Sequence, residues 1–174
     1  MAKDMEGTPT PGEQAREERE IYRGERLRPL GGYVVLMAAF AGLIAGAGGL
    51  VAARGNRLPS GVRVLDVLFL TAGTHKLSRL ISKDAVTSPL RVPFTRYKET
   101  GGPAEVEEEA RRGSQTRRAI GELITCPFCM DLWIATGFTL GMIFAPRFTR
   151  LIAMTLSVLA GADFLQLAYA RLQQ

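Results

Sequence analysis

Four stretches of the chain are long and largely apolar, and most charged residues collect between them. The stretch from Tyr33 to Ala53 carries no charge, whereas the first thirty residues contain no apolar run. Backbone polar groups in hydrocarbon must be satisfied inside a helix, and about 20 helical residues cross a bilayer. The pattern therefore predicts four transmembrane helices, at about 30–53, 62–82, 127–145 and 149–170.

We expect an all-α fold, a multi-pass membrane helix bundle of four transmembrane helices with a cytoplasmic connector. Residues 1–29 form a charged cytoplasmic arm with a short helix, and residues 30–174 form the membrane domain. The connector, 83–126, contains prolines, glycines and an acidic block, which leaves room for a helix around 105–118. A connector of this length is typical of functional or disordered segments.

The span at 62–82 is the least apolar of the four. Asp66 interrupts its first half, and its second half contains His75, Lys76 and Arg79. Long basic side chains can extend from such a helix toward the lipid headgroups. The alternative is an amphipathic helix that lies in the membrane interface without crossing.

Small residues recur at four-residue spacing in two of the predicted spans. Gly42 and Gly46 form such a pair in the first span, and Gly137 and Gly141 form one in the third. Such rows let helix backbones approach closely in lipid. We favour packing within the bundle, and the alternative is a homo-oligomer formed through the first span.

The placement of lysine and arginine predicts the orientation. Of the 22 such residues, 17 lie in the arm, at the end of the second span, in the connector and at the C-terminus, and five lie on the other side. Cytoplasmic segments of membrane proteins carry an excess of Lys and Arg, so both termini and the connector are expected in the cytoplasm. The net charge of +5 suits anionic lipid headgroups and does not indicate nucleic-acid binding.

The sharpest local motif is Cys126-Pro127-Phe128-Cys129, at the start of the third span. Proline suits the first helical position, and a helix N-terminus favours the thiolate form of a cysteine beside it. A redox pair would use Cys126 as nucleophile and Cys129 as resolving thiol, as in the similar motif of glutaredoxin-like proteins. A metal site with His75 as third ligand is less favoured, because a closed zinc site needs four ligands. The third interpretation is simple packing of two small side chains.

Asp163 is an ionisable residue inside the fourth predicted span. Such residues are costly in lipid and usually face a partner or a wet cavity. Asp163 lies about 10 Å from the cytoplasmic end of its helix, and His75 and Lys76 lie about as deep on the second span. We predict that Asp163 pairs with Lys76 or His75, in a structural ion pair or, alternatively, in a proton or ion relay.

Two runs of sequence carry a family resemblance. One extends over 75–95, and the other over 121–129, followed by Leu132-Trp133. Over about 62–170 the chain resembles the YngL-like family of bacterial membrane proteins, a domain of unknown function (number thirteen-sixty). The resemblance implies a multi-pass protein of the bacterial cytoplasmic (inner) membrane and brings no established activity.

Both runs fall at the predicted cytoplasmic boundary, one leaving the second span and one preceding the third. We expect them to meet there and to form a charged binding surface beside the cysteines. Its members are Arg79, Lys83, Asp84, Arg91 and Glu122. An arginine near Cys126 would favour the thiolate, and an acidic residue there would oppose it.

We therefore predict a non-enzymatic membrane protein, without a cofactor, that binds a partner or assembles through its cytoplasmic face. The first alternative is a membrane thiol-disulfide oxidoreductase or redox sensor that uses Cys126 and Cys129. The second is a small transporter with Asp163 as its intramembrane ionisable site. The expected partners are the lipid bilayer, a protein at the cytoplasmic face and a second copy of the chain.

Overall fold

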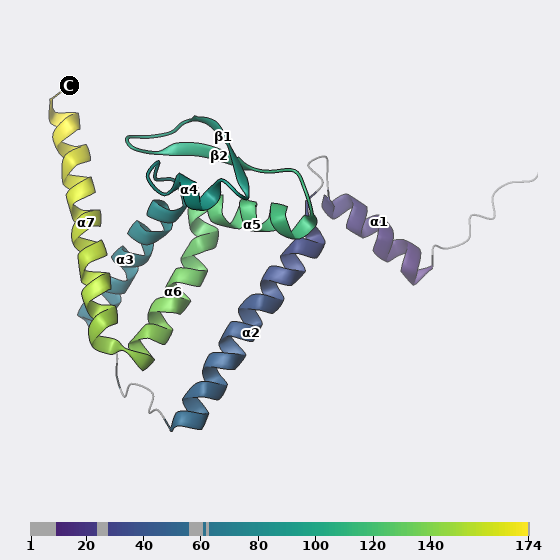
Figure 1. Cartoon of the computed structure of the whole chain (residues 1–174), viewed down its shortest axis with the longest axis horizontal. Coiled ribbons are helices and arrows are strands. Elements are labelled where there is room, and N and C mark those ends of the chain that lie inside the picture. The colour runs from purple at the N-terminus through teal and green to yellow at the C-terminus, as the bar shows by residue number, and fades with distance from the viewer. Residues whose placement is uncertain (1–9, 24–27, 56–60, 62, 174) are drawn as a thin grey trace, which may run out of the picture.

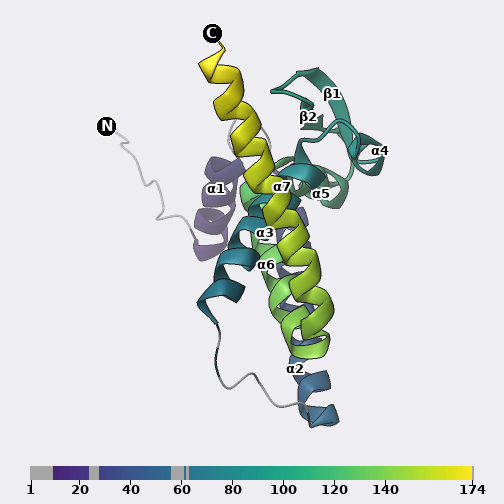
Figure 2. The ribbon, with the colours of Figure 1, turned by 90° about the vertical axis from the view of Figure 1, so that its left-hand side faces the viewer.

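The computed structural model of the chain describes residues 10–23, 28–55, 61 and 63–173 (Figure 1). Four long helices run between the two ends of the molecule, and the C-terminus lies at the same end as a small sheet (Figures 1 and 2). In chain order the elements are α1 (Pro11–Arg23), α2 (Leu30–Arg54), α3 (Val64–Ser82), α4 (Ser88–Arg91), β1 (Thr95–Thr100), β2 (Val106–Ala110), α5 (Gln115–Thr125), α6 (Pro127–Phe144) and α7 (Pro146–Leu172).

Helix α1 confirms the short helix expected in the charged arm, and its start has a local cause. Thr10 and Glu13 form a reciprocal capping box, in which the Thr10 backbone N–H donates to Glu13 Oε2 at 2.8 Å and the Glu13 N–H donates to Thr10 Oγ1 at 3.3 Å. Both the backbone N–H and the hydroxyl of Thr10 stabilise the carboxylate, so the pKa of Glu13 lies below its usual value.

Helices α3, α6 and α7 form the packed part of the bundle. Their buried apolar side chains are Ile134 and Phe138 from α6 and Ala153 and Leu156 from α7, with Phe69 and Leu77 of α3 packed against them. A Cβ at Gly73 of α3 would lie 3.2 Å from the backbone oxygen of Ala153, so the two helices approach closely there. Ser157 also donates from α7 to the backbone oxygen of Phe69 at 2.8 Å.

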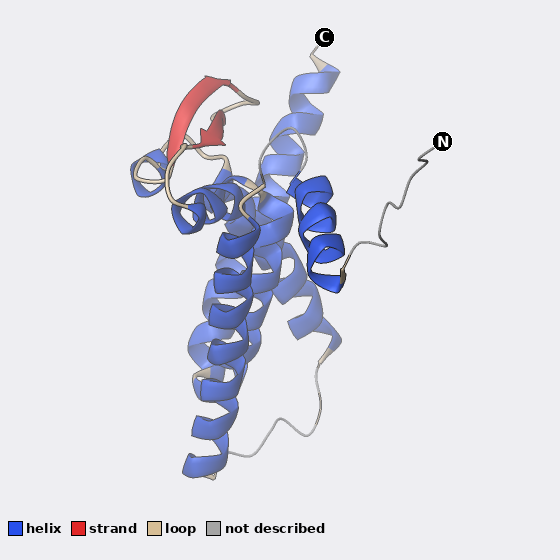
Figure 3. Ribbon diagram, turned by 90° about the vertical axis from the view of Figure 1, so that its right-hand side faces the viewer, coloured by secondary structure: helices blue, strands red, loops and turns tan. Residues whose placement is uncertain are grey.

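Helix α2 stands apart from this bundle and is fixed mainly at one end (Figures 1 and 3). The Gly31 N–H donates to Gln115 Oε1 at 2.9 Å, and a Cβ at Gly32 would collide with the Gln115 backbone oxygen. Further along, Phe40 packs edge-on against Trp133 of α6, with ring centroids 5.2 Å apart. The start of α2 is therefore held against α5 by two glycines.

Three of the four glycines singled out in the sequence do not lie where helices meet in the structure. Nothing lies within 4 Å of a Cβ built at Gly42, Gly46 or Gly137. Only Gly141 of those rows packs closely, against Thr149 across the α6–α7 turn. The expectation that the α2 row packs within the bundle is therefore wrong for the described part of this chain.

The fold is not all-α, because the acidic block of the connector is a β-strand. Strands β1 and β2 pair antiparallel, with Thr95 opposite Ala110 and Thr100 opposite Val106. The end of α3 extends this pairing, since the Val106 N–H donates to the Lys83 backbone oxygen at 2.8 Å. The helix expected at 105–118 begins only at Gln115. Ser114 caps its N-terminus, because the Ser114 side chain accepts a hydrogen bond from the Arg117 N–H.

Three of the described helices, not four, are long and apolar enough to cross a membrane. They are α2, α6 and α7. Helix α3 has 19 residues, a sufficient length, but Asp66, Lys76 and Arg79 lower its apolar character. The prediction of four transmembrane helices is corrected accordingly: α3, the weakest of the predicted spans, is a more polar helix packed against the apolar α6 and α7.

Candidate functional site

A small head, defined as residues 83–126, covers one end of the bundle (Figure 2). Its centre is Arg91, whose side chain is only 1% exposed. Arg91 Nε and one terminal nitrogen donate to the two carboxylate oxygens of Glu108, at 2.9 and 3.2 Å. The remaining N–H groups donate to the Ile81 backbone oxygen, Thr87 Oγ1 and the Asp84 backbone oxygen, at 2.7, 2.7 and 2.9 Å. All five donors of the guanidinium are thus satisfied inside the protein.

Glu108 completes the network from strand β2. Its side chain is 5% exposed and also accepts from Thr95 Oγ1 at 2.8 Å. A buried charge pair tolerates burial only when each remaining polar atom finds a partner, which is the case here. One ion pair therefore ties the end of α3, helix α4 and both strands into a single unit.

The other acidic residues of the hairpin are also paired, at its surface. The pairs are Arg79 with Glu105, Lys83 with Glu107, Arg96 with Glu109 and Lys98 with Glu99. In the last pair Lys98 Nζ donates to Glu99 Oε1 at 2.9 Å, which raises the pKa of Lys98 and lowers that of Glu99. Exposed pairs of this kind contribute little to stability because water screens their attraction.

The expected charged cluster is divided between two places. Arg79 at the end of α3 and Lys83, Asp84 and Arg91 of the head all lie on the side of the hairpin, where Arg79 and Arg91 face glutamates of the hairpin rather than the cysteines. Glu122 lies on α5, where it accepts from the Tyr33 hydroxyl of α2 and from Arg118 Nε at 3.0 Å. Glu122 therefore joins α2 to the head.

The two cysteines lie at the corner between α5 and α6. Cys126 ends α5 and caps α6, its sulfur accepting from the Cys129 N–H at 3.3 Å, and Pro127 occupies the first position of α6. Both thiols are free, and Cys129 is exposed together with Phe128. The Cys126 sulfur thus accepts a hydrogen bond from a backbone N–H at the N-terminus of α6, and the Cys129 thiol remains accessible.

His75 does not join the cysteines. Its ring stacks against Phe164 of α7 with centroids 6.3 Å apart. Within the described residues no three His, Cys, Asp or Glu side chains gather closely enough to hold a metal ion. The structure thus assembles two of the three metal ligands considered in the sequence.

Asp163 pairs with Lys76, one of the two partners predicted for it, with Asp163 Oδ2 and Lys76 Nζ 2.5 Å apart. The sequence did not indicate a second pair, in which Arg150 of α7 donates to both oxygens of Asp66 at 2.9 Å each. Both pairs join α3 to α7. Depth along the helices could have suggested the second pair too, since Asp66 and Arg150 each lie one turn from a helix start on the same side.

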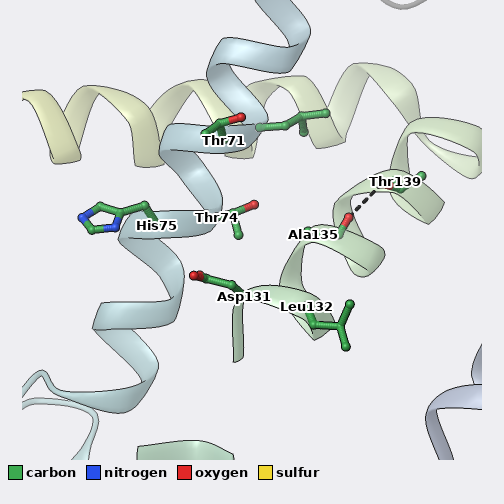
Figure 4. A pocket seen from close by; sticks show the side chains of 8 residues that line it. Thr71, Thr74, His75, Asp131, Leu132, Ala135 and Thr139 are labelled. Carbon is green, nitrogen blue, oxygen red and sulfur yellow. Dashed lines mark hydrogen bonds between the residues drawn. The ribbon is translucent and has the colours of Figure 1, made fainter. Parts of the chain in front are cut away.

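Asp131 of α6 was also missed. It lines a groove between α3 and α6 of about 500 Å³, together with Thr71, Thr74 and His75 of α3 (Figure 4). Its Oδ1 is closed off from solvent, and no described residue donates to it. The signal in the sequence was a charged residue one turn inside an otherwise uncharged span.

Residues 69–169, more than half of the chain, match the family described as Protein of unknown function (DUF1360). The chain belongs to this family. The resemblance to domain of unknown function number thirteen-sixty is thereby confirmed. The DUF1360 region takes in most of α3, the head, α6 and nearly all of α7, and leaves α1 and α2 outside.

A curated relative extends this comparison. The chain is 26% identical over 104 residues to "Sporulation protein YjcA" of Bacillus subtilis (strain 168). The aligned region covers 59% of this chain and 88% of the relative. No solved structure matches the chain.

Proposed function

We propose that this DUF1360 protein is a non-enzymatic component of the bacterial cytoplasmic membrane whose head binds a protein partner on the cytoplasmic side. The proposal rests on the buried Arg91–Glu108 ion pair, whose polar groups all have hydrogen-bond partners. It holds the hairpin in one shape, and a rigid surface loses less conformational entropy on binding than a flexible one. The relative is named a sporulation protein, and we propose that this chain also serves spore formation.

The apolar helices and the order of the chain support the orientation in this proposal. Helices α2, α6 and α7 have the length and composition of membrane spans. The starts of α2 and α6 both adjoin α5, so a chain that crosses along α2 must return before α6 begins. Helix α3 provides that return in our proposal, with Asp66 and Lys76 neutralised by Arg150 and Asp163.

Labelling of cysteines tests this orientation. We expect a membrane-impermeant maleimide to react with the native thiols only after cells are permeabilised, because Cys126 and Cys129 adjoin the cytoplasmic head. In a chain with both cysteines changed to serine, Arg147→Cys should react in intact cells, because Arg147 is exposed at the start of α7, next to the α6–α7 turn. The opposite labelling of the two positions would mean that the head lies outside, and it would overturn the proposed orientation.

Site-specific cross-linking tests the partner. Leu90 and Tyr97 are large side chains, 71% and 63% exposed on the head, and Leu165 of α7, 73% exposed, is a matched control on the bundle. We expect a photo-reactive residue at position 90 or 97 to give one protein adduct of constant mass that position 165 does not give. Arg91→Ala should abolish this adduct because the head loses its shape. Adducts of equal yield at all three positions would contradict a docking role for the head.

The thiol-disulfide alternative rests on the Cys126 sulfur at the N-terminus of α6 and on the exposed Cys129. The same cross-linking experiment separates the two functions. A docking head should keep its adduct when both cysteines are changed to serine. A redox protein should lose its adduct, and should form a mixed disulfide through Cys126 when only Cys129 is replaced. The pairing of Asp163 with Lys76 favours a structural role for Asp163 over transport.

A further inference from the structure

The groove between α3 and α6 contains a carboxylate that no described residue neutralises. Among the described residues, Asp131 Oδ1 is shut off from solvent and receives no hydrogen bond. The other two aspartates of the long helices are each paired with a cation, Asp66 with Arg150 and Asp163 with Lys76. An acceptor oxygen that is closed off from water and receives no hydrogen bond is costly, so the groove favours an external donor or cation beside Asp131.

The lining of the groove offers further acceptors around this carboxylate. In Figure 4 the side chain of Asp131 reaches from α6 toward α3, where Thr74 lies, and the ring of His75 extends away from α6. The hydroxyls of Thr71 and Thr74 have no hydrogen-bond partner in the part of the chain that the structure describes. Leu132 and Ala135 add apolar surface beside them. The groove therefore combines one negative charge, two hydroxyl oxygens and a hydrocarbon wall.

We propose that the α3–α6 groove binds a primary ammonium group, with Asp131 as its counter-ion and Thr71 and Thr74 as hydrogen-bond acceptors. An ammonium presents three N–H donors and needs acceptors of this kind. A hard divalent cation prefers six or more oxygen ligands in a tight shell, more than this groove supplies. A volume of about 500 Å³ also leaves room for a carbon chain behind the nitrogen.

Two sources can supply this group. Asp131 lies four residues into α6, about 6 Å below the head along the helix axis. In the proposed orientation that depth is the boundary between headgroups and acyl chains, so the ethanolamine headgroup of a phospholipid can reach it. A small soluble amine has the same chemistry. Binding of the lipid headgroup requires the proposed membrane insertion, whereas binding of a soluble amine does not.

Binding can be measured on the full chain in nanodiscs of phosphatidylcholine and phosphatidylglycerol. We expect ethylammonium to raise the midpoint of thermal unfolding in a saturable way, and tetramethylammonium, which has no N–H donor, to leave it unchanged at equal ionic strength. Replacing phosphatidylcholine by phosphatidylethanolamine should raise the midpoint and weaken the ethylammonium response if the lipid is the source. If the source is a soluble amine, the exchange of lipids should leave the ethylammonium response unaltered.

Variants then locate the site. Asp131→Asn should raise the half-saturating ethylammonium concentration about tenfold or more, and Thr74→Val should raise it several-fold. Thr155→Val is the matched control, because Thr155 is exposed on α7 outside the groove and donates only to the Leu151 oxygen. If Asp131→Asn fails to fold, the proposal is tested by comparing the half-saturating ethylammonium concentration of Thr74→Val with that of Thr155→Val.

The proposal is overturned by equal responses to the two ammonium ions, by unchanged affinity in Asp131→Asn or Thr74→Val, or by no response to ethylammonium and phosphatidylethanolamine alike. The labelling of Arg147→Cys reports on orientation independently, so failure of the groove proposal does not touch the proposed function.

Discussion

Replacing Arg91 with alanine should lower the free energy of unfolding of the head by about 3–5 kcal/mol, the largest effect expected of any single change in this chain. The substitution removes five hydrogen bonds at once. It also leaves the Glu108 carboxylate, 5% exposed, as a buried charge whose remaining described partner is Thr95. Most of the cost arises from that stranded charge rather than from the lost attraction.

Hydrogen exchange of the head in nanodiscs measures this effect. The N–H groups of Val106 and Arg111 are useful reporters, because they donate to the backbone oxygens of Lys83 and Phe94 at 2.8 Å each. In Arg91→Ala both should exchange much faster, whereas the amides of α6 and α7 should keep their protection. Unaltered protection at these two reporters would mean that the buried pair does not hold the head together.

The neighbouring pair of Arg96 with Glu109 supplies the matched control. Both side chains are about half exposed, at 58% and 47%. Arg96→Ala should therefore change stability by about 1 kcal/mol or less. A double variant, Arg91→Met with Glu108→Leu, should recover most of the loss because neither charge remains buried. A double variant as unstable as Arg91→Ala would show that the hydrogen bonds matter more than the stranded charge.

Replacing Gly32 with alanine should displace α2 from the head, at a cost of about 1–3 kcal/mol. A Cβ at this position would meet the backbone oxygen of Gln115 and lie 2.6 Å from the Ala119 Cβ. Backbone atoms of α5 cannot move aside as a flexible side chain does, so α2 must shift. Alanine is the better helix former of the two residues, and any loss therefore comes from the collision.

Fluorescence of Trp133 measures this displacement. It is the chain's single tryptophan, and Phe40 of α2 packs against it. Gly32→Ala should shift the emission of Trp133, and Gly46→Ala should not, because nothing lies within 4 Å of a Cβ at Gly46. If Gly46→Ala is the damaging change, the small-residue face of α2 contacts a second copy of the chain in the membrane.

The sequence by itself determined the helices and the features that depend on near neighbours in the chain. Long, mainly apolar stretches marked α2, α6 and α7, and Pro127 with a sulfur acceptor before it marked the start of α6. The pairing of Lys76 with Asp163, 87 residues apart, could be predicted because depth along a helix follows from residue counting at a fixed rise. Each of these inferences needs only a local rule.

The tertiary structure decided which side chains meet, and several local signals pointed elsewhere. The acidic block resembled a helix, but pairing with the basic β1 and with the end of α3 makes it a strand. Arg91 looked like one surface cation among several, and only the closing of the hairpin over it buries it against Glu108. The glycines that matter, Gly31 and Gly32, lie where α2 meets α5 and carry no four-residue spacing.

The tertiary structure also decided the partners of the aspartates in the long helices. The sequence gives Asp66, Asp131 and Asp163 the same side chain in similar apolar surroundings. Asp163 and Asp66 each pair with a cation more than 80 residues away in the sequence. Asp131 instead lines a groove together with threonines. Which carboxylate is neutralised within the chain depends on the rotation and depth of packed helices. Those quantities are set by the whole core and cannot be read from any one segment.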